Sequence, residues 1–214
     1  MKNLTIKAFL YVLAAYSILV LFIAALLRGF DLRNFIDLIK LFPIVATADV
    51  LGYAIFTTWV WRWRYLEGWL IAFPDLNGTW QGVIQSNWKD AEGKSICPIP
   101  TILTIKQSFG RMSCTMRTAE MESHSYLEGF CIDKNAQVRQ LCYSFTSRPH
   151  AGLRERSTPH DGTMLFNIIG KPVYKLEGEY WTQRQTTGKI TLSFRTREML
   201  DELPSDLPAH PMKG

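Results

Sequence analysis

The sequence predicts a membrane-anchored all-β protein, in which two N-terminal transmembrane helices precede an eight-stranded antiparallel, up-and-down β-barrel. Two long apolar segments before residue 62 predict the helices, and eight short runs with a hydrophobic period of two predict the strands. Turn residues separate these runs at short intervals, which favours antiparallel neighbours. The expected parts are an anchor over residues 1–73, a β domain over 74–200 and a flexible, Pro-rich tail over 201–214.

The composition agrees with this division into two parts. Hydrophobic residues make up 47% of the 214 residues, but the most continuous apolar stretches lie before Trp69. The net charge of +5 suits phosphates or an anionic lipid surface, although a charge of this size is also common on surfaces that bind neither.

The cysteines form no Cys-x-x-Cys pair of the kind that zinc or redox chemistry uses. We therefore expect structural, reduced cysteines, and an extracellular disulfide framework is the alternative that their even number permits. The four residues are Cys97, Cys114, Cys131 and Cys142.

The first predicted span covers residues 8–27, which contain no charged residue and are bracketed by Lys7 and Arg28. Twenty residues at about 1.5 Å each cross a hydrocarbon layer of roughly 30 Å. A secretory signal peptide is the alternative, but the apolar run is long for one, no small-x-small cleavage site follows it, and a second span comes next.

The second predicted span covers residues 41–61 and contains Asp49 near its middle. A carboxylate at this depth costs a few kcal/mol, so we expect it to be protonated, paired or turned toward another helix. Ala48 and Gly52 give the small-xxx-small spacing that lets helices approach closely. One interpretation assigns Ala48, Asp49 and Gly52 to assembly of a helical bundle, and the other is a tolerated acid that stays protonated.

The segments that flank the second span have the composition of membrane interfaces. Residues 35–42 show apolar side chains at helical spacing, which predicts a short interfacial helix. After the span, Arg62 and Arg64 are positioned to reach lipid headgroups. An aromatic belt is expected from Trp59, Trp61, Trp63, Tyr65 and Trp69.

Two spans place both termini on the same side of the membrane. The terminal side carries Lys2, Lys7, Arg62 and Arg64, against Arg28, Arg33 and Lys40 in the hairpin loop. The positive-inside rule therefore favours a multi-pass membrane protein with a cytoplasmic N-terminus and β domain, by a margin of one charge.

Beyond Pro74, runs rich in Val, Ile, Thr, Tyr and Phe alternate with turn residues. The predicted strands are 78–86, 100–107, 111–119, 123–132, 137–147, 163–169, 175–184 and 189–196. Eight antiparallel strands suit a barrel with room for one small ligand, and a β-sandwich is the alternative. Trp80, early in the first strand, is similar to the tryptophan that closes the floor of lipocalin-like barrels.

Arginines and aromatic rings are the candidate binding groups, because guanidinium groups match phosphate oxygens and rings stack on bases. The loop over residues 148–162 is expected to act as a lid or else to be a solvated, mobile run of charge. The strands supply the rings of Tyr126, Tyr143, Tyr180 and Trp181, and most of them are expected to belong to the core. The candidate ligand-binding residues are Arg117, Tyr126, Arg139, Tyr143, Arg148, Arg154, Arg156, Trp181 and Arg195.

Nothing in the sequence indicates catalysis, a metal or a cofactor. The chain contains no Gly-x-x-x-x-Gly-Lys phosphate loop, no His-Glu-x-x-His and no Gly-x-Ser-x-Gly. The tail after Thr196 is expected to begin as a short helix.

Two spans, the exit WVWRWRYLEGW and the opening LNGTWQG of the β domain together resemble the two-transmembrane, β-strand-rich effectors of bacterial cyclic-oligonucleotide antiphage (CBASS) systems. The resemblance implies a cytosolic barrel that senses a cyclic dinucleotide made by a partner nucleotidyltransferase after infection. It further implies that the helices lie in the inner membrane, form a homo-oligomer in its lipid bilayer and disrupt it. A lipocalin-like carrier of lipid and a module that recruits partners to the membrane are the alternatives.

Overall fold

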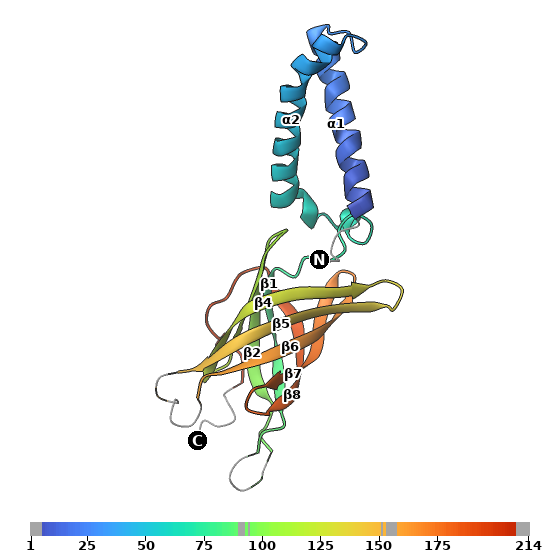
Figure 1. Ribbon diagram of the computed structural model, residues 1–214. Coiled ribbons are helices and arrows are strands. Elements are labelled where there is room, and N and C mark those ends of the chain that lie inside the picture. The colour runs from blue at the N-terminus through green and yellow to red at the C-terminus, as the bar shows by residue number, and fades with distance from the viewer. Residues whose placement is uncertain (1–5, 90–92, 94, 151, 153–157, 209–214) are drawn as a thin grey trace. The chain divides into compact units, whose positions relative to one another are not determined.

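The computed structural model describes residues 6–89, 93, 95–150, 152 and 158–208 of the chain. The chain forms two compact units, Met1–Pro74 and Asp75–Gly214. The first unit contains the helices and the second contains the strands (Figure 1).

Helices α1 (Ile6–Arg28) and α2 (Phe35–Thr58) are both long and apolar enough to cross a membrane. The prediction of a separate interfacial helix over residues 35–42 is wrong, because this segment forms the first turns of α2. The Asn34 side chain accepts a hydrogen bond from the backbone N–H of Ile36 at 3.0 Å and caps the helix there. Pro43 lies inside α2, where its ring removes one backbone donor without ending the helix.

The two helices pack tightly near their connection. Ala24 and Ala25 of α1 are buried together with Leu41 of α2. Small residues let the helix backbones approach closely. Elsewhere the outward faces are apolar and exposed, with Phe22 and Ile55 as examples, as expected of helices that contact lipid.

The segment after α2 contains two short 3-10 turns, Val60–Arg62 and Arg64–Leu66. The predicted aromatic belt needs one correction, because Trp61 is only 3% exposed and its ring lies 5.8 Å from that of Phe73. The other predicted members are exposed, namely Trp59, Trp63, Tyr65 and Trp69.

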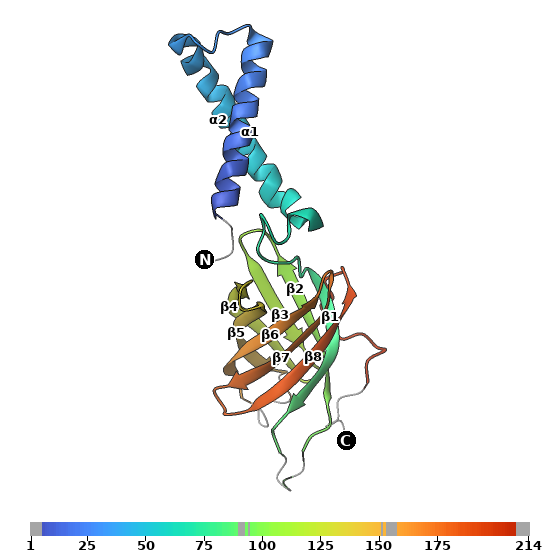
Figure 2. The same ribbon diagram turned by 90° about the vertical axis from the view of Figure 1, so that its right-hand side faces the viewer.

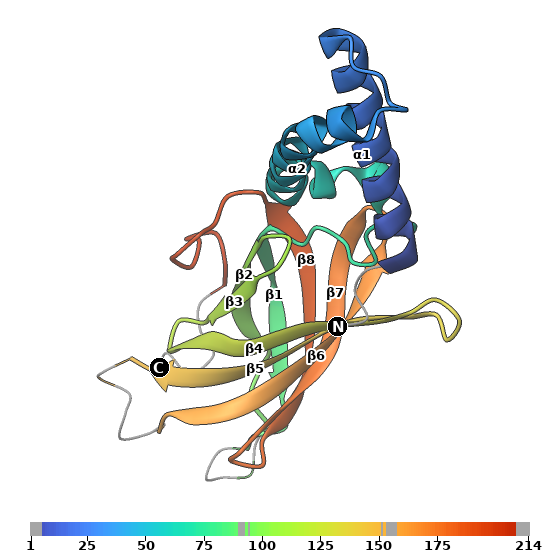
Figure 3. The same cartoon turned by 45° about the horizontal axis from the view of Figure 1, so that its top comes forward.

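Eight antiparallel strands form a closed barrel in which each strand pairs with its neighbours in the sequence and the last pairs with the first (Figures 2 and 3). The barrel prediction is confirmed, the sandwich is excluded, and no predicted strand end differs from the observed end by more than three residues. The strands are β1 (Gly78–Ser86), β2 (Ile99–Gln107), β3 (Met112–Arg117), β4 (Met121–Asp133), β5 (Val138–Pro149), β6 (His160–Gly170), β7 (Val173–Thr182) and β8 (Thr187–Thr196).

One end of the barrel is filled by packed side chains. Trp80 is buried there, as the sequence predicts, and its Nε1 donates to the Leu76 carbonyl at 3.0 Å. Its ring meets that of Phe194 edge-on, with 5.2 Å between ring centroids. A Cβ at Gly82 would lie 1.9 Å from the carbonyl oxygen of Thr191, so only glycine permits this approach of β1 to β8.

The segment after β8 crosses the outside of the barrel without regular secondary structure. The predicted helix is wrong, because no helix occurs between residues 197 and 208. Thr104 donates to the Leu200 carbonyl at 2.7 Å, and the Leu200 N–H donates to the Thr79 hydroxyl at 3.0 Å. These side-chain bonds to the backbone replace the bonds that a helix would supply.

Candidate ligand-binding cavity

The up-and-down topology gathers one set of inward side chains at the end of the barrel opposite Trp80. Odd-numbered strands end where even-numbered strands begin, and alternate residues face inward. Chain positions far apart in the sequence therefore meet there. The described residues that line the cavity at this end are Ile84, Ser86, Trp88, Ile96, Ile99, Met116, Thr118, Glu120, Met121, Ser123, Phe145, Ser147, His160, Met164, Tyr180, Thr182, Arg184, Thr186 and Ile190.

The cavity has a volume of about 440 Å³, within the roughly 300–1,000 Å³ usual for small-molecule sites. The core side chains of Met116, Phe145, Met164 and Ile190 contribute to its lining, so the cavity lies directly against the packed interior. The remaining lining residues come from the strand ends and the loops that join them.

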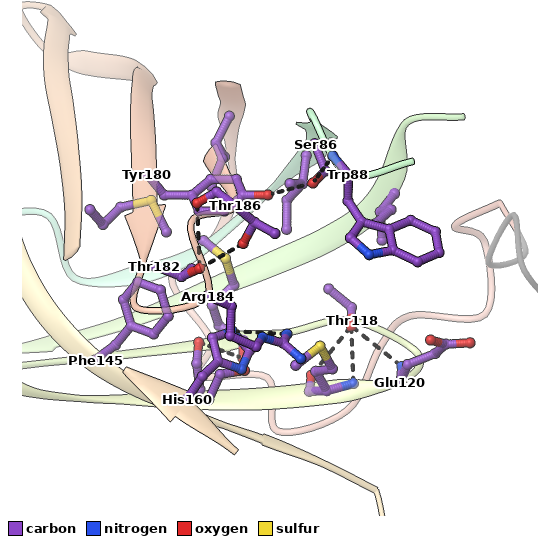
Figure 4. A pocket seen from close by; sticks show the side chains of 18 of the residues that line it. Ser86, Trp88, Thr118, Glu120, Phe145, His160, Tyr180, Thr182, Arg184 and Thr186 are labelled. Atoms are coloured by element: carbon purple, nitrogen blue, oxygen red, sulfur yellow. Dashed lines mark hydrogen bonds between the residues drawn. The ribbon is translucent and has the colours of Figure 1, made fainter. Parts of the chain in front are cut away.

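Hydroxyl groups fix the geometry of one wall (Figure 4). Tyr180 donates to the Ser86 hydroxyl at 2.9 Å, and Ser86 accepts from the backbone N–H of Trp88 at 3.2 Å. Thr182 and Thr186 are joined through their hydroxyls at 2.6 Å. Burial raises the pKa of Tyr180, so its hydroxyl stays a neutral donor at physiological pH.

A positive group lies at the end of the same wall. Arg184 Nη2 is 3.3 Å from His160 Nε2, and the two side chains point toward one another in Figure 4. The other ring nitrogen, His160 Nδ1, is 3.1 Å from the Thr158 carbonyl oxygen. Among the lining residues that the structure describes, Arg184 is the one permanent cation and Glu120 the one carboxylate.

The candidate arginines from the sequence lie elsewhere among the described residues. Arg117 pairs with Glu122 at 2.7 Å, and Arg139 donates to the Gly170 carbonyl at 3.1 Å. Arg195 pairs with Asp206 at 3.0 Å and also donates to Gln81. Arg148 is exposed at the end of β5, while positions 154 and 156, also arginines, fall outside the described residues.

The structure brings two of the three candidate rings together. Tyr126 and Trp181 are 60% and 47% exposed and line a shallow depression on the outside of the barrel. Tyr143 is instead 1% exposed in the core, where its hydroxyl has no hydrogen-bond partner among the described residues. A ligand role for the sequence candidates remains a prediction, because none of those described lines the cavity.

The sequence placed His160 in the predicted lid loop and Tyr180 among the strand rings, but the candidate ligand-binding residues included neither of them, nor Arg184 or Trp88. The signal that identifies them is positional, because each lies near a strand end at the same end of the barrel.

Asp49 has a partner within its own helical hairpin. The Ser17 hydroxyl of α1 lies 3.0 and 2.9 Å from the two carboxylate oxygens of Asp49. Tyr16 donates to the Ala48 carbonyl at 3.1 Å, and its ring occupies the space beside Gly52. The face predicted for assembly therefore contacts α1 of the same chain, and its part in an oligomer remains a prediction.

A closed barrel with a lined cavity at one end is an architecture that holds a small molecule, and the chain also has two helices long and apolar enough to cross a membrane. Residues 71–193 match the family described as Cap15, cyclic dinucleotide receptor domain, so the chain belongs to this family. CD-NTase-associated protein 15 of Staphylococcus schleiferi is 23% identical over 159 residues, which cover 74% of this chain and 80% of that protein. The predicted membership in the two-transmembrane β-barrel effectors of CBASS is confirmed, and the family is a receptor family rather than an enzyme family.

Proposed function

We propose that this chain is an antiphage effector whose barrel cavity binds one cyclic dinucleotide and whose helices respond by forming a homo-oligomer that disrupts the inner membrane. The observation that carries the proposal is the cavity of about 440 Å³ with its mixed lining. A separate nucleotidyltransferase would supply the ligand, and no stable complex with it is required.

The chemistry of the cavity suits a molecule with two bases and two phosphodiesters. Arg184 offers a planar set of N–H donors for phosphate oxygens, and Trp88 and Tyr180 offer ring faces for bases. Ser86 and the hydroxyl pair of Thr182 and Thr186 add donors and acceptors for sugar or base edges.

The alternative is a carrier of lipid, which the apolar floor of the cavity favours. Met116, Phe145 and Ile190 present no polar atom able to orient a nucleotide. The rim favours the nucleotide, because guanidinium, imidazole and hydroxyl groups match phosphates, sugars and base edges, and a hydrocarbon chain offers nothing for them to bind.

The membrane step is supported by the apolar outer faces of α1 and α2. Such faces accept either lipid or the helices of further copies, because lipid tails and leucine side chains are equally apolar. The orientation with cytoplasmic termini and barrel rests on the excess of one basic residue on that side.

Isothermal titration of the full chain in detergent micelles with a panel of 3′,3′-linked cyclic dinucleotides tests the binding step. We expect at least one member to bind with micromolar or tighter affinity. Binding by no member, together with lipid that copurifies in one-to-one amounts, would support the carrier.

Dye release from liposomes that contain the full chain tests the membrane step. We expect the tightest-binding cyclic dinucleotide to release the dye, and a linear dinucleotide of the same bases to release none. Ligand binding without dye release would separate the receptor from the membrane-disrupting role and contradict the latter.

A further inference from the structure

The contact between Arg184 and His160 fixes the position of the imidazole proton. A guanidinium group only donates hydrogen bonds, so His160 Nε2 accepts from Arg184 Nη2 across 3.3 Å. The ring proton then resides on Nδ1, which donates to the Thr158 carbonyl across 3.1 Å. His160 is therefore neutral in this arrangement.

The surroundings favour this neutral form. Burial lowers the pKa of His160 below its usual value, and the charge of Arg184 lowers it further. The hydrogen bond to Thr158 and the carboxylate of Asp161 act in the opposite direction without reversing the shift.

The groups around the ring come from four places. Asp161 follows on the same strand, and Ser147 of β5 is the register partner of His160. Tyr180 lies near the end of β7 and Arg184 in the turn that follows it, while Glu120 lies in the loop between β3 and β4 and lines the same cavity. Arg148 follows Ser147 on β5 but is exposed.

An anion in the cavity reverses the electrostatic balance at His160. A phosphodiester oxygen that accepts from the fork of Arg184 competes for the donor that now bonds to His160 Nε2. Nε2 then loses its donor while a negative charge lies next to it. Protonation of Nε2 turns this nitrogen into a donor to the phosphate and places a positive charge beside the negative one, because imidazolium donates from both ring nitrogens.

We propose that Arg184 and His160 together form the phosphate-binding element of the cavity, and that His160 takes up one proton when a phosphodiester of the cyclic dinucleotide binds. This inference rests on the proposed function. In this arrangement one phosphodiester contacts Arg184 and His160, and the bases contact the aromatic lining residues Trp88 and Tyr180.

The proposal fixes the sign of the pH dependence of binding. The pKa of His160 is lowered in the free protein and raised by the phosphate in the complex, so proton uptake occurs between these two pKa values. Affinity is therefore greatest below the pKa of the free protein, falls as pH rises from that pKa to the pKa of the complex, and is constant above it. Because one proton is linked to binding, the dissociation constant changes by up to about tenfold per pH unit within that window.

The test is isothermal titration of the full chain in detergent micelles between about pH 6 and about pH 8, with the cyclic dinucleotide of the panel that the wild type binds most tightly. Measurements in two buffers of different ionisation enthalpy report the number of protons taken up. The phosphodiester itself does not titrate in this range.

Three variants separate the roles. His160→Gln keeps an amide oxygen that accepts from Arg184, so we expect binding at pH 8 within a few-fold of the wild type, with no proton uptake and a flat pH profile. Arg184→Gln should lose roughly tenfold or more in affinity at every pH, the usual effect of removing a charged hydrogen bond. Arg111→Gln, in the turn between β2 and β3 away from the cavity lining, removes the same charge and should follow the wild type.

Equal proton uptake in the wild type and in His160→Gln would overturn the proposal, as would wild-type affinity in Arg184→Gln. Both results leave the proposed function intact, because the ligand still binds. Binding of no cyclic dinucleotide to the wild type would refute the proposed function and this inference with it. An unchanged melting temperature of the ligand-free His160→Gln chain establishes that its barrel is folded.

Discussion

Replacement of Ser17 by alanine tests whether the contact between the helices holds the hairpin together. Ser17→Ala removes the hydroxyl that lies 3.0 and 2.9 Å from the Asp49 carboxylate oxygens. It leaves the carboxylate inside a segment long and apolar enough to span a membrane. The hydrogen bond from Tyr16 to the Ala48 carbonyl and the packing of the Tyr16 ring beside Gly52 stay in place.

The expected cost combines two effects. An interhelical hydrogen bond in a membrane contributes about 0.6 kcal/mol on average and up to about 1.7 kcal/mol. The carboxylate that is left behind also loses its polar neighbour, which is more costly than never having a polar group there. We therefore expect Ser17→Ala to destabilise the hairpin by about 1–2 kcal/mol.

The double variant Ser17→Ala with Asp49→Ala should recover most of the lost hairpin stability, because neither member of the polar pair is left without the other. Separation of the helices is measured by SDS titration of the full chain in mixed micelles, with fluorescent labels at the start of α1 and the end of α2. A double-mutant cycle then gives the coupling energy. If Ser17→Ala has the same effect with and without Asp49, the two side chains are not coupled and the reasoning is refuted.

Three other predictions test the barrel. Trp88→Ala should weaken cyclic dinucleotide binding by about 5–100-fold, the value of one base stacked on a ring, and unchanged affinity in titration calorimetry would remove Trp88 from the site. Tyr143→Phe should raise the free energy of unfolding by about 1 kcal/mol in urea titration, because the buried hydroxyl has no partner, whereas a loss of ligand affinity would support the sequence assignment of Tyr143 to the ligand. Burial raises the pKa of the Cys114 thiol, so iodoacetamide at pH 8 should modify the exposed Cys97 and Cys131 first, and equally rapid labelling of Cys114 in mass spectrometry would contradict its burial.

The architecture follows from periodicity, and so the sequence was sufficient to predict it. The strands alternate with a period of two and are separated by short turns, which leaves few arrangements other than a meander that closes on itself. Phe35–Thr58 shows where periodicity is insufficient. The helical period of residues 35–42 continues into the span, and the sequence pattern does not show whether Pro43 ends one helix there. In the structure Pro43 lies inside a single continuous helix.

The binding residues were harder to predict because a period of two does not say which of its two phases faces inward. Tyr180 and Trp181 are neighbours on β7, yet Tyr180 lines the cavity and Trp181 lies outside. A bulge between Ser125 and Leu127 changes the phase within β4, so counting from one known residue fails across it. The inward series on β7 becomes clear only once Leu176 is seen to be buried.

The partner of Asp49 illustrates a different limit. Helical periodicity places Asp49 on one face of α2, but it contains no information about which residue of α1 lies opposite. That assignment depends on the length of the connection and on the close packing of Ala24 and Ala25 against Leu41. Ser17 therefore emerges only from the three-dimensional arrangement.

The proposed assembly on ligand binding is constrained by the energetics of the Asp49 contact, and the energies that follow apply to that proposal. Exchanging Ser17 for an equivalent partner on another copy replaces one hydrogen bond of about 1 kcal/mol with another, so the exchange is nearly neutral by itself. A shift from about 1% to about 99% assembled requires roughly 5.5 kcal/mol of differential ligand affinity. The polar contact thus makes the exchange feasible without driving it, and the driving energy must come from a cavity that binds the ligand more tightly in the assembled state. By linkage, assembly must then raise the affinity for the cyclic dinucleotide by the same factor by which the cyclic dinucleotide favours assembly.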